Sequence, residues 1–194
     1  MWLILSGLNW GVLLTILYGH GSNCSKLLRG LLKHFVEKNV HQDMKLNIRT
    51  TVAKSYWEVW LGFDETLFRK LSPPFPPVKV VRFDGCKEGD IVSLELNFLF
   101  FKQRWTSLIT VQETTDSEIF FVDKGTQLPF FLAFWQHRHR IIKDQNQAII
   151  ADEIEFQTPF LLTDYLFYPL LWLQFAYRKP IYRKVFKSQL HDYK

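Results

Sequence analysis

The sequence is poor in cysteine and lacks the short motifs that mark several common chemistries. Its 194 residues contain two cysteines, Cys24 and Cys86, which are too few for a disulfide framework and lack the spacing of a zinc site. It has neither a glycine-rich phosphate loop nor a G-x-S-x-G elbow. Cys86 has no histidine nearby in the sequence, so we do not expect a cysteine nucleophile. Nothing requires an oxidising compartment, and we expect a cytoplasmic protein without cofactor.

Charged residues are absent from the start of the chain. No Asp, Glu, Lys or Arg precedes Lys26, and Trp2–Tyr18 is mostly apolar. As a helix this run would reach about 26 Å, just short of a bilayer core of about 30 Å. It also lacks the basic region and cleavage site of a secretory signal. Residues 1–43 are therefore either an anchor that holds the protein on the cytoplasmic side of a membrane, or an extension from an upstream start, with the native chain beginning at Met44.

Acidic residues are scarce at the other end. From Tyr177 to Lys194 there are six Lys or Arg and one acid, Asp192, while the whole chain has a formal net charge of +5. This basic segment suggests contact with an anionic membrane surface or a phosphate group, or it serves solubility alone. Basic residues and exposed aromatics do not alternate along one face, so we expect no nucleic-acid partner.

Apolar residues are abundant, at 47% of the chain, and Phe alone contributes 18. From Met44 onward they follow regular periods. The pattern predicts an α+β domain over residues 44–194, in which an antiparallel sheet wraps around a long C-terminal helix. Two short helices, separated at Asp64 and Glu65, follow the first strand. The expected strands are 44–52, 77–83, 92–100, 104–112, 117–123, 130–143 and 148–157, and the C-terminal helix is 161–190 with a kink or break near Pro169 and Pro180.

Two of these strands have alternations that assign their buried faces. In 92–100 the apolar positions extend from Val92 to Phe98 and Phe100, which we therefore expect to face the core. In 104–112 the same reasoning places Trp105, Ile109 and Val111 on one face.

Two other strands combine apolar and ionisable residues. In 130–143, period two places Trp135, His137 and His139 on one face and the arginines on the other. In 148–157, Asp152 lies on an otherwise apolar row, where a carboxylate needs a partner. If these strands are neighbours, a His–Asp pair forms, which is either an acid–base candidate or a purely structural contact. Because no cysteine or carboxylate near the histidines in sequence completes a ligand set, we expect no metal site.

The order of elements and three segments resemble a known superfamily. LPFFLAFWQHRHRI, ADEIEFQTPF and YRKPIYRKVF, between Leu128 and Phe186, resemble small bacterial members of the START-like superfamily (SRPBCC), which includes lipid-transfer domains and polyketide cyclases. The resemblance covers Met44 to about Leu190. It implies the helix-grip fold and a cavity for a hydrophobic molecule between the sheet and the last helix. It does not imply catalysis, because the superfamily contains both enzymes and carriers.

We therefore expect a non-catalytic protein that binds or carries a small hydrophobic ligand, such as a lipid, a quinone or a polyketide-like aromatic molecule. This hypothesis requires a cavity above roughly 300 Å³. The alternatives are a cyclase or dehydratase that uses the His–Asp pair, with His137, His139 and Asp152 as catalytic candidates, and a membrane-associated accessory protein. The expected ligand-binding residues are Trp105, Phe131, Trp135, His137, His139, Asp152, Phe156, Tyr165 and Trp172.

Overall fold

The computed structural model describes residues 43–187 of the chain. The expected N-terminal anchor, Cys24 and the last residues of the predicted C-terminal helix lie outside the described residues. Between residues 43 and 187, no helix is long and apolar enough to cross a membrane.

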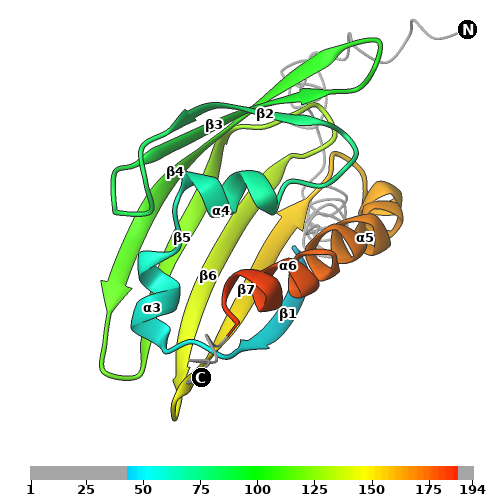
Figure 1. The fold of residues 1–194 in the computed structure, drawn as a ribbon. Helices are drawn as coiled ribbons and strands as arrows, with labels where there is room; N and C mark the ends of the chain where they lie inside the picture. Colours follow the sequence, from blue (N-terminus) through cyan, green and yellow to red (C-terminus); the bar gives the residue numbers. More distant parts are fainter. Residues whose placement is uncertain (1–42, 188–194) are drawn as a thin grey trace, which may run out of the picture. The chain divides into compact units, whose positions relative to one another are not determined.

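Seven antiparallel strands form one curved sheet in the order β1-β7-β6-β5-β4-β3-β2. Figure 1 shows the helices of the described residues on the concave side of this sheet. Because the first strand pairs with the last, β1 is an edge strand beside β7. The strands are β1 (Met44–Val52), β2 (Val78–Phe83), β3 (Ile91–Asn97), β4 (Lys102–Thr114), β5 (Glu118–Gln127), β6 (Phe134–Asp144) and β7 (Gln147–Gln157).

Side-chain caps fix the two short helices that follow β1. Ser55 and Glu58 form a capping box at the start of α3 (Tyr56–Leu61). The carboxylate of Asp64 accepts a hydrogen bond of 2.8 Å from the amide of Leu67 and so begins α4 (Glu65–Lys70). The predicted break at Asp64 is confirmed, because this residue lies between the two helices and caps the second.

The C-terminal helix is divided just before Pro180, as expected. α5 (Leu161–Ala176) ends at Tyr177, and α6 (Arg178–Val185) begins directly after it. Pro169 lies inside α5, whereas Pro180 lies in the first turn of α6, where a missing backbone N–H is tolerated. At the start of α5, the buried carboxylate of Asp164 accepts a hydrogen bond of 2.6 Å from the Thr158 amide. This bond ties α5 to the end of β7.

The expected buried faces of two strands are wrong in part. β3 ends at Asn97, and residues 98–101 form a turn in which Leu99 has a positive φ of 63° and Phe100 is 96% exposed. Phe100 therefore points to solvent rather than into the core. In β4 the register shifts between Ile109 and Val111, so Val111 is 40% exposed while Ile109 stays buried.

The apolar core has two clusters, one at each end of the concave face. One packs α3, α4 and α6 against the ends of β6 and β7 near Ile141 and Ile150. The other packs α5 against Trp135, Ile154 and Phe156. The middle of β6 and β7 lies between these clusters, and the polar residues of these two strands on the concave face occur there.

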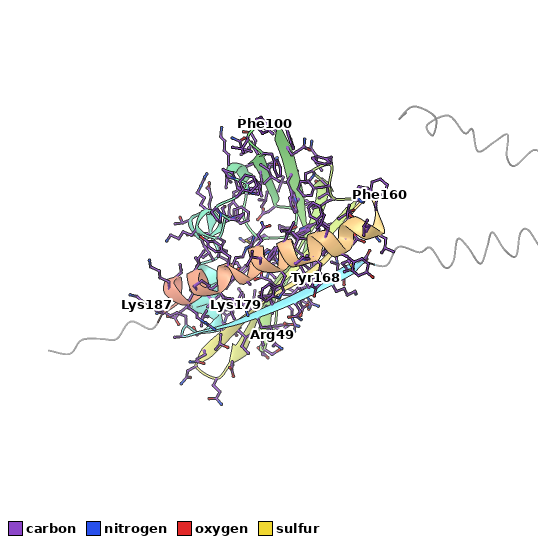
Figure 2. All side chains as sticks on the ribbon, turned by 90° about the vertical axis from the view of Figure 1, so that its right-hand side faces the viewer. Arg49, Phe100, Phe160, Tyr168, Lys179 and Lys187 are labelled. Atoms are coloured by element: carbon purple, nitrogen blue, oxygen red, sulfur yellow. The ribbon has the colours of Figure 1, made fainter. Side chains whose placement is uncertain are left out.

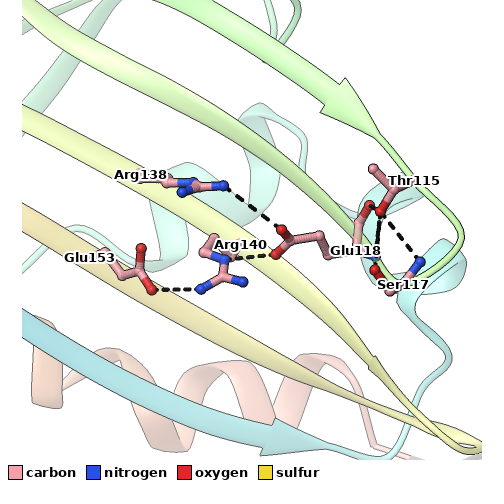
Figure 3. Close-up of polar contacts among 6 residues, drawn as sticks. All are labelled: Thr115, Ser117, Glu118, Arg138, Arg140 and Glu153. Carbon is pink, nitrogen blue, oxygen red and sulfur yellow. Dashed lines mark hydrogen bonds and ion pairs between the residues drawn. The ribbon is translucent and has the colours of Figure 1, made fainter.

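The convex face of the same strands is held by charged pairs, shown in Figure 3. Arg140 donates hydrogen bonds to Glu118 on β5 (2.7 Å) and to Glu153 on β7 (2.9 Å). Arg138 lies 3.8 Å from the other oxygen of Glu118. The arginines therefore occupy the face opposite the histidines, as period two predicts, and they link three adjacent strands.

Candidate functional site

Two adjoining chambers lie between the concave face of the sheet and the helices. The inner chamber has a volume of about 110 Å³ and is lined by polar as well as apolar side chains. The outer chamber has a volume of about 1050 Å³, above the roughly 300 Å³ that the ligand-binding hypothesis requires. Both chambers touch Leu96, Trp105, Leu171 and Gln174, so these residues mark the junction between them.

The outer chamber is an apolar space beneath α5. Of the residues that line it, only Thr163, Gln174 and Tyr177 carry a polar side-chain group other than the Trp N–H groups. The remaining lining consists of proline, aromatic and aliphatic side chains from the segment after α4, strands β2 to β4 and the β3–β4 turn, the β5–β6 and β7–α5 connections, and α5. Such a space suits the apolar body of a ligand rather than a charged group.

Two histidines of the inner chamber form a His–Asp–His cluster with Asp152 behind them, built by two paired strands. β6 and β7 pair with His139 opposite Asp152, which brings both histidines to one carboxylate. The Nε2 of His137 lies 3.0 Å from Oδ1 of Asp152, and Nδ1 of His139 lies 3.2 Å from the same oxygen. The two imidazole rings are 3.6 Å apart between centroids, and the His139 ring stacks on Phe121. All three polar residues are buried.

Burial and pairing set the protonation states of this cluster. Burial lowers the pKa of His137 to about 3, even though the Asp152 carboxylate opposes this shift. Burial alone would raise the pKa of Asp152, but the contacts with His137 and His139 outweigh it and hold that pKa far below the usual value. Near neutral pH, His137 is therefore a neutral imidazole that donates its Nε2–H to an ionised carboxylate.

A second carboxylate, Asp123 on β5, faces the same chamber. Its Oδ1 accepts a hydrogen bond of 3.2 Å from the indole N–H of Trp135. Burial raises the pKa of Asp123, and bonds from Ser107 and Trp135 act in the opposite direction. The guanidinium of Arg178 also lines the chamber, with its central carbon 4.1 Å from the ring centroid of Phe175.

The chamber contains one set of groups with the chemistry of metal ligands. Asp123, His137 and His139 each offer one ligand atom within 4.8 Å of the others, and imidazole with carboxylate suits a divalent transition metal. Arg178 lines the same chamber, and a guanidinium disfavours a second cation nearby. Asp123 already accepts a hydrogen bond from Trp135, and Asp152 accepts one from His137. The sequence-based ground for expecting no metal site, that no carboxylate near the histidines completes a ligand set, does not hold in the structure, because β5 brings Asp123 beside them.

Burial also decides the role of Cys86, which lines the inner chamber. Its thiol lies 3.7 Å from the carbonyl oxygen of Phe63, and burial raises its pKa to about 12. The thiol is therefore protonated at neutral pH. This agrees with the expectation that Cys86 is no nucleophile.

Most residues expected at the ligand site do line a chamber. Trp135, His137 and His139 line the inner one, Phe131 and Trp172 line the outer one, and Trp105 lies at the junction. The three others do not. They are Asp152, behind the histidines, Phe156, which is packed in the core below α5, and Tyr165, which is 64% exposed because its position on α5 faces away from the sheet.

Sequence reasoning missed several polar residues of the inner chamber. Asp123, Ser107, Gln174 and Arg178 all line it, although none stands near the histidines in the sequence. The alternation of β5 carried a signal for Asp123, since Phe121 and Asp123 share a face of that strand. Arg178 had no such signal, because it lies in a run of basic residues. Its side chain reaches the inner chamber only because α6 begins at this residue, after the break at Tyr177.

No protein-family model matches the chain. One curated protein, Serpin A11 of Rattus norvegicus, is 32% identical over 75 residues, and the chain spans only 18% of its length. Such a short match carries no conclusion about the fold or the activity of this chain.

Solved structures share the architecture at low sequence identity. Protein Ms6760 from Mycobacterium smegmatis has a TM-score of 0.55 at 15% identity, with 76% of this chain and 93% of that chain covered. A point mutant of norcoclaurine synthase from Thalictrum flavum, in complex with a transition-state analogue, has a TM-score of 0.52 at 11% identity, covering 74% and 93%. The di-domain aromatase/cyclase StfQ of the steffimycin biosynthetic pathway has a TM-score of 0.56 at 10% identity, covering 87% and 60%. The chain therefore has the helix-grip fold, as the sequence predicted.

Proposed function

We propose that this protein binds and carries a small hydrophobic molecule without changing it chemically. The observation that carries the proposal is the outer chamber, a space of about 1050 Å³ with an almost entirely apolar lining. Such a volume accommodates a lipid chain, a quinone or a polyketide-like aromatic molecule. An anionic membrane surface is the source and destination expected for a ligand of this kind.

The polar inner chamber would determine the orientation in which the ligand binds. Its apolar body would occupy the outer chamber, and its polar end would pass Trp105 and Gln174 at the junction. There it would meet Arg178, whose guanidinium suits a carboxylate, a phenolate or a carbonyl oxygen. The His137–Asp152 contact lies beyond and fixes one wall of the chamber in a single arrangement.

The test places a large side chain in the outer chamber and measures binding of the fluorescent apolar probe N-phenyl-1-naphthylamine. Ala176 lines the chamber, so Ala176→Trp should weaken binding about tenfold, or about 1.4 kcal/mol. Ala133 is exposed and lines neither chamber, so Ala133→Trp is the matched control and should bind as the parent does. Equal affinity of both variants would show that the probe binds elsewhere and would remove the support for this proposal.

The His–Asp cluster favours a second function, a cyclase or dehydratase. A neutral imidazole with a carboxylate on its Nε2–H can accept a proton at its other nitrogen, as a general base does. In an enzyme, Asp152→Asn should reduce kcat by about 100-fold or more and leave ligand affinity nearly unchanged. Parallel losses of turnover and affinity would count against catalysis by this pair.

A further inference from the structure

The outward face of α5 is apolar, although it is not covered by any described part of the chain. Between Leu161 and Tyr177 the only charged residue is Asp164, which is buried. Leu162 is 81% exposed and Leu166 is 62% exposed. We define the α5 face by its exposed residues Leu161, Leu162, Tyr165, Leu166, Tyr168, Leu170, Trp172, Leu173 and Tyr177. A contiguous exposed apolar patch of this kind usually marks a site that binds a membrane, a ligand or another protein.

The α5 face continues into the rim of the outer chamber. Four aromatic residues, Phe75, Phe101, Phe130 and Phe160, line this chamber and are also exposed to solvent. Leu170, Trp172 and other members of the α5 face line it from the helix side. Whatever covers the α5 face therefore lies next to the mouth of the apolar chamber.

Basic residues flank this apolar surface. α6 and the segment after it expose Arg183, Lys184 and Lys187, and no exposed acid occurs on α5 or α6. On the edge strand β1, Leu46 and Ile48 pack under α5, so the alternating Lys45 and Arg49 lie on the opposite face of the sheet, where Lys45 pairs with Glu155. Figure 2 looks onto this side and shows α5 and α6 running from Phe160 to Lys187, with Tyr168 between them and Arg49 below.

We propose that the α5 face and the chamber rim dock on an anionic lipid membrane. Leucine side chains would enter the acyl boundary, and Tyr165 and Trp172 would lie at headgroup depth, where amphipathic rings are favoured. The exposed basic residues of α6 and the segment after it, Arg183, Lys184 and Lys187, would contact anionic headgroups. The mouth of the outer chamber would then open toward the lipid phase. The docking itself does not depend on the identity of the carried ligand.

The test is co-sedimentation of the full chain with vesicles of phosphatidylcholine and phosphatidylglycerol. Leu162→Glu/Leu166→Glu places two charges on the α5 face at positions that line neither chamber and should lower the bound fraction at least about tenfold. Leu61, at the end of α3, is 78% exposed, so Leu61→Glu is the matched control and should bind normally. Binding should also fall at high salt and with pure phosphatidylcholine. Normal vesicle binding by Leu162→Glu/Leu166→Glu would overturn the proposal.

The same variants distinguish the other occupants of this face. If a second copy covers it, sedimentation velocity without vesicles will show a dimer that Leu162→Glu/Leu166→Glu dissociates, while the parent fails to bind vesicles. If residues 1–42 cover it, their removal will create vesicle binding that the intact chain lacks. Either result overturns membrane docking by the intact chain. Ala176→Trp should bind vesicles normally, so a failure of the ligand proposal remains separate from a failure of this one.

Discussion

His137 and Asp152 form a buried hydrogen bond of 3.0 Å between β6 and β7, with side chains that are 3% and 2% exposed. The contact lies between two apolar clusters, where an ionised carboxylate needs a partner. Its energetic role can be measured separately from any role in ligand binding.

Asp152→Asn should destabilise the domain by about 1–3 kcal/mol. The substitution removes the carboxylate that accepts the hydrogen bond from His137, and leaves the buried imidazole without an ionised partner. Urea unfolding followed by circular dichroism gives the free energy. Glu155→Gln is the control, since Glu155 pairs with an exposed Lys45 and its loss should change the free energy by less than about 1 kcal/mol. Equal effects of the two substitutions would show that the buried contact contributes no more to the free energy of unfolding than the exposed pair does.

The depressed pKa of His137 predicts a loss of stability in acid. An unperturbed histidine has a pKa of 6.5, whereas that of His137 is about 3 in the folded protein, so the unfolded chain binds the proton first as the pH falls. The contribution of His137 is therefore fully present above about pH 6.5 and decreases toward pH 3, by up to about 1.4 kcal/mol per pH unit.

Urea unfolding at about pH 7, 6 and 5 tests this sign. The parent should lose stability on acidification more steeply than His137→Gln. Asp123→Asn should not flatten the curve, because a raised carboxylate pKa contributes stability at low pH and loses it as the pH rises. Parallel curves for the parent and His137→Gln would contradict the burial of a neutral imidazole.

Much of the fold was predictable from the sequence, because period two and period 3.6 reflect burial directly. Met44–Val52 alternates over its whole length and forms β1 with the predicted bounds. The failures have local causes. Phe98 and Phe100 continue the alternation of β3, but a turn begins there, and the register shift in β4 reverses the side on which Val111 lies.

The candidate site was predictable only where one strand contains it. Alternation alone places His137 and His139 together, and the assumption of neighbouring strands adds Asp152. Arg178 and Gln174 come from helices whose rotation over the sheet is set by packing, which no period in the sequence reveals, although Pro180 predicted a break nearby.

Asp164 should be as important for stability as its burial suggests. The bond from the Thr158 amide to its carboxylate joins the end of β7 to the first turn of α5, so Asp164→Ala should cost about 1–3 kcal/mol in urea unfolding. Asp116 lies exposed in the turn before β5, and Asp116→Ala should change stability by less than about 0.5 kcal/mol. If Asp164→Ala is as stable as Asp116→Ala, the bond does not fix the helix.

Arg178 should select ligands by their polar end. In competition with N-phenyl-1-naphthylamine, the parent should prefer oleate to oleyl alcohol, because the guanidinium pairs with a carboxylate. Arg178→Met should reduce this preference about tenfold, or about 1.4 kcal/mol. Arg183→Met, at an exposed position of α6 that lines neither chamber, should retain it. Equal preferences in the two variants would place the polar end of the ligand elsewhere.

The central claim, that the chambers hold a hydrophobic ligand, is tested most directly by native mass spectrometry of the protein purified from its own host. The native mass should exceed the denatured mass by that of one small molecule, and Ala176→Trp purified in the same way should lose most of this excess. Equal native and denatured masses for the parent, in gentle conditions that preserve other lipid complexes, would contradict the carrier function.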